Sequence, residues 1–276
     1  MISRSELQRL ANRQKVALGT LEKDYILTEV LKALPQVPPL RDLLIFKGGT
    51  ALRKAYFSHW RYSEDLDFTA RQNMPKEGLK EALSTWYSQV EQVSRIQLTT
   101  RMLHKPDGYA RIRTQFIGPL SYPGMIFMDL SFDEPLCLAP ESRKLLTAPF
   151  PDEDRKVLTY PLEELLAEKM RSLLERGKSR DYYDVWRLLK EQHPELDFVL
   201  LGTVLLKKLT HKGLTLRDMS DFLPKNTGGL KRYWEEDLKQ QVTLLPPLDE
   251  VLEELQDMLD KLVAPHLAFA VSDVQQ

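Results

Sequence analysis

The hydrophobic positions of this chain follow a helical period at both ends and the period of a strand in the middle. Residues 3–34 predict two helices that break near Gly19, with Thr20 capping the second. Between residues 40 and 160 the apolar runs are short and bounded by turn residues, which is typical of strands. From Pro161 onward the 3.6-residue pattern returns. The chain therefore predicts an α+β protein: a mixed sheet flanked by helices, followed by an all-helical carboxy-terminal half.

Six runs in the middle of the chain predict the strands. Two of them are joined by Lys105-Pro106-Asp107-Gly108, whose proline and glycine are typical of a hairpin turn. An amphipathic helix over residues 75–93 precedes this hairpin. We expect one domain over residues 1–160 and a helical second domain over residues 161–276. The predicted strands are residues 43–46, 63–68, 96–103, 109–117, 125–132 and 157–160.

A glycine pair stands between the first predicted strand and the next helix. At Gly48 and Gly49 the backbone can adopt conformations closed to other residues and can lie close to a ligand. Thr50 stands where the helix begins, so its hydroxyl and nearby backbone N–H groups can face an anion. Taken alone, such a turn is more often only a tight turn. It lacks the Lys-Ser/Thr pair of a P-loop, which argues against a P-loop kinase.

Carboxylates follow on two later strands. Strand alternation puts Ser63, Asp65 and Asp67 on one face, with apolar residues on the other. Neighbouring acids repel each other unless a cation lies between them, although paired acids also occur at solvated strand edges. Ser63 is either a phosphate contact or a plain strand hydroxyl. Asp129 stands in an otherwise apolar strand, where a core-facing carboxylate needs a cation or a salt bridge.

Taken together, these features indicate one kind of chemistry. Asp65, Asp67 and Asp129 can supply the oxygen ligands that two Mg²⁺ (or Mn²⁺) ions require. A Gly-Gly-Thr turn beside them would hold the triphosphate of an NTP. This is the two-metal arrangement for in-line attack at a phosphorus atom.

The same residues resemble a known signature. Gly48-Gly49-Thr50, fourteen intervening residues, and then Asp65-Leu66-Asp67-Phe68 resemble the motif of the nucleotidyltransferase superfamily that includes DNA polymerase beta. The gap is slightly longer than is usual there, and threonine stands where serine is more common. More narrowly, the chain resembles the AbiEii/AbiGii family of toxin nucleotidyltransferases, which includes the MenT toxins. Glu22-Lys23-Asp24-Tyr25 is similar to that family's amino-terminal helix, and the resemblance covers about residues 20–190.

Two further motifs of that family fall in the helical half. Lys169 stands where the family has a helical lysine that contacts the triphosphate, although its position alone is also compatible with a surface lysine. The run Arg180-Asp181-Tyr182-Tyr183-Asp184 matches the family's Arg/Lys-Asp-x-x-Asp motif. Asp181 and Asp184 share a helix face. Asp181 either supports the nucleotide or satisfies the helix dipole, and Asp184 either faces the site or orients Lys169 and Arg180.

The second of these motifs departs from the family pattern. The family often has another Lys, Arg or Thr four residues after the lysine, and Leu173 stands there. Arg176 or Arg171 would take over that role, depending on how the helix is oriented.

Composition limits the partners. The chain has 276 residues, 42% of them hydrophobic, which is enough for a sizeable core in one or two domains. Its net charge of -1 does not attract nucleic acid, so RNA binding needs a local basic patch. Cys137 is the only cysteine, which excludes an internal disulfide. The start is polar and no apolar run could cross a bilayer, so we expect a cytoplasmic protein without a membrane segment.

Three groups of basic residues are candidates for such a patch, although charges on helices usually form only a solvated face. The groups are Arg171, Arg176, Lys178, Arg180 and Arg187; Lys207, Lys208, Lys212, Arg217, Lys225, Lys231 and Arg232; and, on the hairpin, His104, Arg111 and Arg113.

The resemblance implies an enzyme that transfers an NMP from an NTP and releases pyrophosphate. It also implies the toxin of a toxin–antitoxin or phage-defence (abortive infection) pair, a separately encoded antitoxin, and a tRNA 3′ end as the acceptor. Two other functions stay open: NMP transfer onto a protein hydroxyl, and a non-catalytic module that binds RNA or a partner protein. The implied catalytic residues are Asp65, Asp67, Asp129, Lys169 and Asp184, the metal ligands are Asp65, Asp67 and Asp129, and the nucleotide-binding residues are Gly48, Gly49, Thr50, Ser63, Lys169, Arg180 and Asp181.

Overall fold

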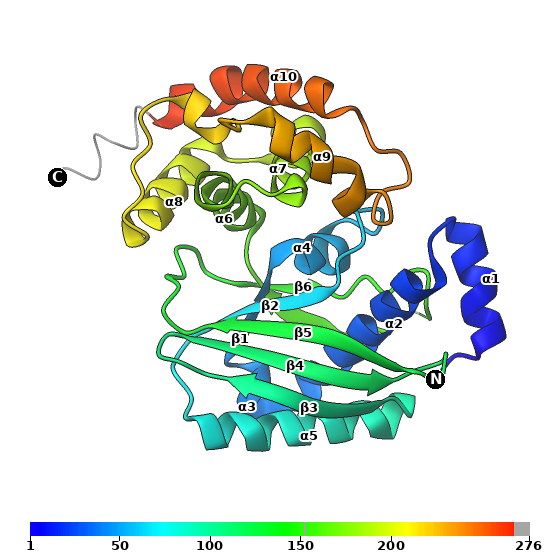
Figure 1. Ribbon diagram of the computed structural model, residues 1–276. Helices are drawn as coiled ribbons and strands as arrows, with labels where there is room; N and C mark the ends of the chain where they lie inside the picture. Colours follow the sequence, from blue (N-terminus) through cyan, green and yellow to red (C-terminus); the bar gives the residue numbers. More distant parts are fainter. Residues whose placement is uncertain (152, 268–276) are drawn as a thin grey trace. The chain divides into compact units, whose positions relative to one another are not determined.

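The computed structural model describes residues 1–151 and 153–267, and the chain divides into two compact units (Figure 1). The first, which we call the sheet unit, comprises Met1–Leu136 and Pro140–Tyr160. The second, which we call the helical unit, comprises Cys137–Ala139 and the chain from Pro161 onward. Strands with flanking helices followed by carboxy-terminal helices confirm the predicted α+β class.

Within the described residues, seven strands form one mixed sheet in the order β3-β4-β5-β2-β1-β7-β6. The strands β3, β4 and β5 form an antiparallel meander, β2 runs parallel to β5, and β1 is antiparallel to β2 and parallel to β7. The strands are β1 (Leu44–Lys47), β2 (Asp65–Ala70), β3 (Gln97–His104), β4 (Tyr109–Ile117), β5 (Pro123–Ser131), β6 (Glu141–Lys144) and β7 (Lys156–Thr159).

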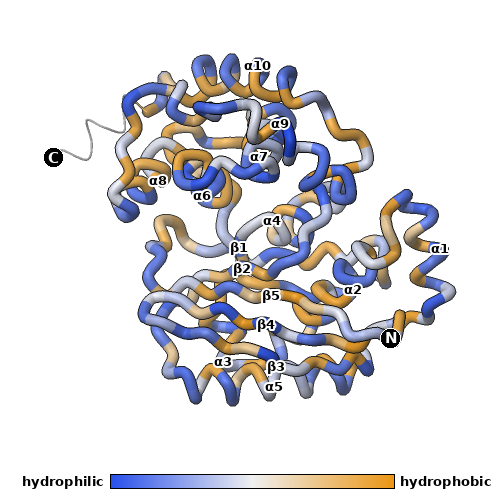
Figure 2. The backbone as a smooth tube through the Cα atoms, in the orientation of Figure 1, coloured by the Kyte–Doolittle hydropathy of each residue, from blue (hydrophilic) through white to orange (hydrophobic). Residues whose placement is uncertain are grey.

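One face of the sheet is buried by α2 and α5, and the opposite face carries the acidic residues. Leu66 and Phe68 point into the core, and the Phe68 ring contacts Trp86 of α5 at 6.2 Å between centroids. The Trp86 indole N–H donates to the Val30 carbonyl of α2 at 2.9 Å. Figure 2 shows hydrophilic and hydrophobic positions alternating along β4, as the strand period requires. The helices of this unit are α1 (Arg4–Gln14), α2 (Leu18–Ala33), α3 (Pro38–Arg41), α4 (Gly48–Ala51) and α5 (Lys76–Ser94), with short segments η1 (Leu34–Gln36) and η2 (Leu52–Tyr56).

The two predicted amino-terminal helices are present, and three local details of the sheet unit differ from the predictions. The amino-terminal helices break at Lys15, whose left-handed backbone (φ 55°) ends α1, so Gly19 lies inside α2. Thr20 is not the cap, because Ala17 precedes α2 without a side-chain hydrogen bond. The strand β6 was not expected, since its sequence is wholly polar and it pairs only at the edge of the sheet, with β7.

The helical unit packs α6 against both α7 and α8, and α7 against both α9 and α10. Leu165, Leu166 and Met170 of α6 are buried, in accord with the predicted apolar face. Glu164 and Lys208 form a fully buried ion pair at 2.9 Å, so Lys208 is not part of a surface basic patch. No helix in the described part of the chain is long and apolar enough to span a bilayer. The helices are α6 (Leu162–Glu175), α7 (Ser179–Gln192), α8 (Phe198–His211), α9 (Thr227–Leu238) and α10 (Leu248–Met258), with η3 (His193–Glu195), η4 (Met219–Phe222) and η5 (Leu259–Val263) between or after them.

Candidate active site

The glycine pair is packed directly against the acidic strand. Gly48 has a left-handed backbone (φ +78°), and a Cβ at this position would lie 2.2 Å from a carboxylate oxygen of Asp67. A Cβ at Gly49 would lie 2.8 Å from the Arg61 guanidinium and 3.2 Å from Ser63 Oγ. Gly48 therefore requires glycine for both backbone conformation and close approach, whereas Gly49 has only close approach to a side chain as its reason. The turn is more than a connection between a strand and a helix, because it brings backbone N–H groups beside a carboxylate, a serine and an arginine.

We expect Gly48→Ala to destabilise the protein and to displace Asp67. The left-handed backbone alone costs about 1–2 kcal/mol for a residue with a Cβ, and the contact with Asp67 adds to that cost. Gly213→Ala is a matched control, because Gly213 also has a positive φ (+64°) but a Cβ added there would have no atom within 4 Å. Urea unfolding of both variants checks the prediction. Equal losses of unfolding free energy would contradict it.

The acidic strand presents its carboxylates as alternation predicts. Asp65 and Asp67 of β2 are half-buried on one face, while Leu66 between them is fully buried on the other. In the sheet register Asp67 lies opposite Asp129 of the parallel strand β5 and opposite Lys47 of the antiparallel strand β1. The sheet therefore brings two of the three predicted acids side by side.

Thr50 has a structural contact that the sequence did not indicate. Its side chain is buried, and its hydroxyl donates to the backbone carbonyl of Asp65. This bond ties the start of the helix to the start of the acidic strand. The nearby backbone N–H groups, rather than this proton, are thus the donors that α4 offers to an anion.

Asp129 does not face the core, so that expectation is wrong. Its side chain is 24% exposed and shares the half-exposed face of β5 with Phe127. The Tyr109 hydroxyl donates to Asp129 Oδ1, and Arg111 Nε lies 3.6 Å from the same oxygen. Burial, followed by the hydrogen bond to this carboxylate, raises the pKa of Tyr109, so the phenol stays a proton donor at neutral pH.

The donor atoms of these acids suit a hard divalent cation. Mg²⁺ and Mn²⁺ prefer carboxylate oxygens, and β2 and β5 place two carboxylates in register. Among the residues that the structure describes, no three His, Cys, Asp or Glu side chains are gathered into a ready metal site. The carboxylate oxygens thus fit the predicted cation. Two carboxylates do not fill the coordination shell of such a cation, so water or substrate oxygens would supply the other ligands.

The Glu22–Tyr25 motif of α2 contacts the segment that follows the glycine turn. Asp24 is buried and accepts from Arg53 Nε at 3.1 Å and from Lys54 Nζ at 2.8 Å, both in the η2 segment that follows the turn. Burial lowers the pKa of Lys54 to about 8, against the opposing effect of Asp24. Next to Asp24, Lys23 pairs with Glu64, the residue before Asp65. This motif is therefore structural: it anchors both ends of the segment between the two strands.

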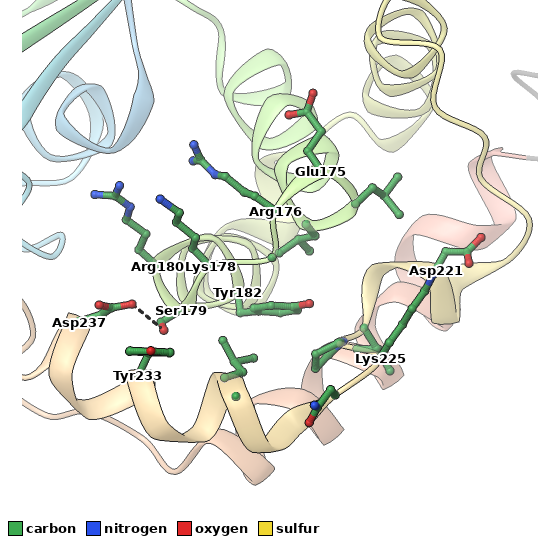
Figure 3. Close-up of a pocket in the computed structure, with 18 of the residues that line it drawn as sticks. Glu175, Arg176, Lys178, Ser179, Arg180, Tyr182, Asp221, Lys225, Tyr233 and Asp237 are labelled. Atoms are coloured by element: carbon green, nitrogen blue, oxygen red, sulfur yellow. Dashed lines mark hydrogen bonds between the residues drawn. The ribbon is translucent and has the colours of Figure 1, made fainter.

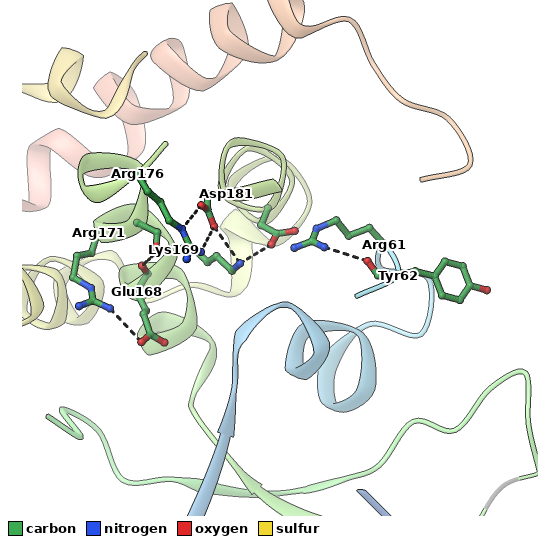
Figure 4. A network of polar contacts seen from close by, with 9 residues as sticks. Arg61, Tyr62, Glu168, Lys169, Arg171, Arg176 and Asp181 are labelled. Carbon is green, nitrogen blue, oxygen red and sulfur yellow. Dashed lines mark hydrogen bonds and ion pairs between the residues drawn. The ribbon is translucent and has the colours of Figure 1, made fainter. Parts of the chain in front are cut away.

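In the helical unit, Lys169 lies in a buried ionic network rather than on the surface (Figure 4). The residue is only 9% exposed, and its Nζ lies 2.9 Å from Asp184 and 3.5 Å from Asp181. Asp181 also accepts two bonds from Arg176, at 2.8 and 3.0 Å. Burial would raise the pKa of Asp181, but Lys169 and Arg176 outweigh it and hold the pKa below its usual value.

Of the two arginines that could replace the residue missing at Leu173, one belongs to this network. Leu173 is buried, and Arg171 pairs with Glu168 at 3.3 Å and with Glu175 at 3.6 Å. Arg176 is the arginine that joins Lys169, through their shared partner Asp181.

Two side chains near the acids have no counterpart among the residues predicted from the sequence. Arg61 is buried, donates to the Tyr62 carbonyl at 3.1 Å and lies against Gly49. No periodic pattern marks it, because it lies in the segment between α4/η2 and β2. Tyr109 could have been found, since alternation along β4 puts it on the same face as Arg111.

Comparisons with known proteins bear on the fold and the family of the chain. No curated protein matches the chain. Among solved structures, the nucleotidyltransferase toxin MenT4 from Mycobacterium tuberculosis H37Rv superposes with a TM-score of 0.74 at 17% identity, covering 98% of this chain and 94% of that one, which establishes a shared fold. The family model described as nucleotidyl transferase AbiEii toxin, type IV TA system, matches residues 29–260. The chain therefore belongs to the AbiEii family of nucleotidyltransferase toxins of type IV toxin–antitoxin systems.

Proposed function

We propose that this toxin transfers an NMP from an NTP to the 3′ end of an RNA, with tRNA as the acceptor, in the cytoplasm and under the control of a separately encoded antitoxin. The observation that carries the proposal is the packing of the Gly48–Gly49 turn against Asp67, with Asp129 in register beside it. Anion-binding N–H groups next to paired carboxylates suit a triphosphate with its cations. Blocking a tRNA 3′ end would stop translation, which fits a toxin.

The candidate site residues of the sheet unit have three roles in this proposal. Asp65, Asp67 and Asp129 would hold Mg²⁺ or Mn²⁺, which when bound would activate the acceptor hydroxyl and neutralise the leaving pyrophosphate. The backbone N–H groups that follow Gly48 and Gly49 would bind the triphosphate. The positively charged Arg61, beside Gly49 and Ser63, offers a further phosphate contact.

The helical unit would contribute a lysine for the same reaction, on the strength of the family motif. Lys169 would neutralise triphosphate charge, and Asp184 at 2.9 Å would orient its ammonium group. Arg180 and Asp181 belong to the same motif and would support the nucleotide.

The test is to incubate the purified protein with total cellular RNA and protein and with each labelled NTP in turn, with Mg²⁺. The RNA and protein fractions are then separated, and the RNA 3′ ends are sequenced. We expect label in tRNA, with the added nucleotide at the 3′ end. Label in the protein fraction would establish transfer onto a protein hydroxyl instead. No incorporation, together with no thermal stabilisation by NTP and Mg²⁺, would indicate a non-catalytic binding module.

Tyr109 gives a prediction about metal affinity. Tyr109→Phe removes the proton that Asp129 Oδ1 accepts and leaves Arg111 as the group beside it. Loss of a hydrogen bond that orients a metal ligand typically costs about 10–100-fold in metal affinity or activity. We expect the Mn²⁺ concentration for half-maximal transfer to rise by a factor in that range, while kcat at saturating Mn²⁺ falls less. Tyr122→Phe, at an exposed tyrosine of the same unit, is the control, and equal metal dependence of the two variants would contradict the prediction.

A further inference from the structure

The helical unit contains a groove that is lined in part by Arg180 and Tyr182 of the Arg180–Asp184 motif (Figure 3). It has a volume of about 750 Å³ and is lined by the end of α6, the start of α7, the segment before α9, and α9 itself. We call it the basic groove, after Lys178, Arg180 and Lys225, which line it together with Tyr233.

The acidic residues of the basic groove each have a polar partner within the helical unit. Three carboxylates line the groove. The pairs are Glu175 with Arg171 at 3.6 Å, Asp221 with Arg217 at 2.6 Å, and Asp237 with the Ser179 hydroxyl at 2.9 Å. Arg217 offsets Asp221, whereas Asp237 keeps its charge beside a neutral hydroxyl and Glu175 shares Arg171 with Glu168. These two acids offset only part of the positive charge of the groove.

Most cations of the basic groove have no acidic partner among the described residues. Arg176 is taken up by Asp181, but Lys178, Arg180 and Lys225 form no ion pair with any residue that the structure describes. Three charges without counter-ions in one concave surface attract an anionic ligand. They do so in a protein whose net charge of -1 gives no general attraction to polyanions.

The positions of these cations define the shape of the ligand. In Figure 3, Lys178 and Arg180 extend in the same direction at one side of the groove, and Lys225 lies at the other side. Cations on two sides of one groove suit a chain with repeated phosphates, which can contact both sides at once. Tyr233 is 49% exposed and lines the same groove, with the Arg232 guanidinium 5.6 Å from its ring centroid, so an exposed part of the ring can stack on a base. Phosphates together with a stacked ring are what an unpaired nucleic-acid strand offers.

We propose that the basic groove binds a single-stranded segment of RNA, with Lys178, Arg180 and Lys225 on its phosphates and Tyr233 stacked on a base. Arg180 then contacts the RNA instead of the nucleotide that the family motif assigns to it. The inference rests on the proposed function insofar as this RNA is the acceptor of the NMP. Binding itself requires neither NTP nor divalent cation, so it can be measured apart from transfer. Of the basic residues that the sequence analysis named, these three line the groove without an ion-pair partner among the described residues. The others lie outside the groove or, like Arg176, are paired.

The experiment measures fluorescence anisotropy of a labelled 12-nucleotide single-stranded RNA with the full chain, without NTP or divalent cation, over a series of salt concentrations. Each phosphate contact to a single strand contributes about 0.7 to the slope of log K against log salt, so the triple variant Lys178→Ala, Arg180→Ala, Lys225→Ala is expected to reduce that slope by about 2. The affinity at low salt falls by about tenfold or more. Tyr233→Ala weakens binding by about tenfold without changing the slope, because stacking releases no counter-ions.

Matched controls make the result specific to the groove. The triple variant Lys207→Ala, Lys239→Ala, Lys261→Ala removes the same charge from exposed lysines of the helical unit that do not line the groove, and should leave the slope unchanged. Lys225→Glu, at an exposed site before α9, tests the groove with a single change should the triple variant fail to fold. Equal slopes for groove and control variants would overturn the proposal. So would displacement of the RNA by poly-aspartate as readily as by unlabelled RNA, because the groove would then take an acidic protein segment.

Failure of this inference and failure of the proposed function give different results. Asp65→Asn should bind the RNA as the unmodified protein does. RNA binding in the groove without NMP transfer would refute the proposed function and keep the groove. NMP transfer to RNA that is as efficient in the groove variant as in its control would refute the groove as the acceptor site.

Discussion

Replacing Asp67 by asparagine is expected to lower kcat/KM for NMP transfer by about 10³-fold or more. The variant loses a negatively charged oxygen ligand of the metal ions that would stabilise the negative charge of the transition state. The carboxylate lies against the Gly48 backbone and opposite Asp129, the two features on which the proposed site depends. Asparagine has nearly the same shape, so it avoids a new clash with Gly48. We expect the circular dichroism spectrum to be unchanged and the free energy of unfolding to change by no more than about 1 kcal/mol.

Glu64→Gln is the matched control for Asp67→Asn. It also neutralises one carboxylate beside β2, but Glu64 pairs with Lys23 and its side chain is 41% exposed. Activity within about threefold of the unmodified protein is expected, since a surface ion pair contributes about 0–1 kcal/mol. Radiolabel incorporation into RNA measures both variants. Asp67→Asn with activity similar to that of Glu64→Gln would contradict the proposed role of the acidic strand.

Features of the fold that depend on local periodicity could be predicted from the sequence. The alternation in β4 and the apolar faces of α5 and α6 follow from which residues are buried, and burial leaves a direct trace in the sequence. The strand β6 leaves no such trace, because it is polar and gains its place from edge pairing with β7. The break at Lys15 was missed for a similar reason: a left-handed lysine has no compositional signal, whereas Gly19 has one that was misleading.

In the candidate site, the sequence was informative about neighbours along the chain and poor about neighbours across the sheet. The shared face of Asp65 and Asp67 is a property of one strand. The bond from Tyr109 to Asp129 depends on the register of β4 against β5, which the sequence does not specify. Asp129 was expected in the core because its strand is apolar, but Phe127 on the same face is only partly buried, so the strand pattern overstated the burial of that face.

Buried charges were the other source of error. From the sequence, Lys208 was a candidate for a surface basic patch. In the structure it is buried and forms an ion pair with Glu164. Lysines on helices usually reach solvent, so only the three-dimensional packing distinguishes this one. Lys169 of the same unit is also buried, and here the family motif argued against a plain surface lysine, whereas composition gave no indication.

Lys169→Met is expected to destabilise the helical unit and to abolish NMP transfer. The variant removes the cation that lies 2.9 Å from Asp184 and 3.5 Å from Asp181, while both carboxylates remain fully buried. Removing one partner of a buried ion pair typically costs about 3–5 kcal/mol, because a desolvated charge is left behind. The loss is measured as the difference in free energy of unfolding in urea.

Two further variants separate stability from catalysis. In Lys169→Met, Asp184→Asn both charges are removed, so most of the lost stability should return while NMP transfer stays absent. Lys208→Met breaks the other buried pair of the unit and should cost a similar free energy, yet molecules that remain folded should transfer NMP normally. Full activity in Lys169→Met, or lost activity per folded molecule in Lys208→Met, would contradict the role assigned to Lys169.

The pH dependence of the Lys169→Met defect should follow from Asp181. Its folded-state pKa lies below the usual value of 3.8 because Lys169 and Arg176 outweigh the effect of burial, so its ionised form stabilises the fold above that value. This stabilisation disappears as the pH falls through the lowered pKa. Without Lys169 the pKa of Asp181 rises, and part of the stabilisation is already absent at neutral pH. The stability difference between the unmodified protein and Lys169→Met should thus be largest near pH 7 and should shrink towards pH 3. A difference that stays constant over this range would mean that lost packing of the lysine side chain, rather than loss of its charge beside Asp181 and Asp184, causes the defect.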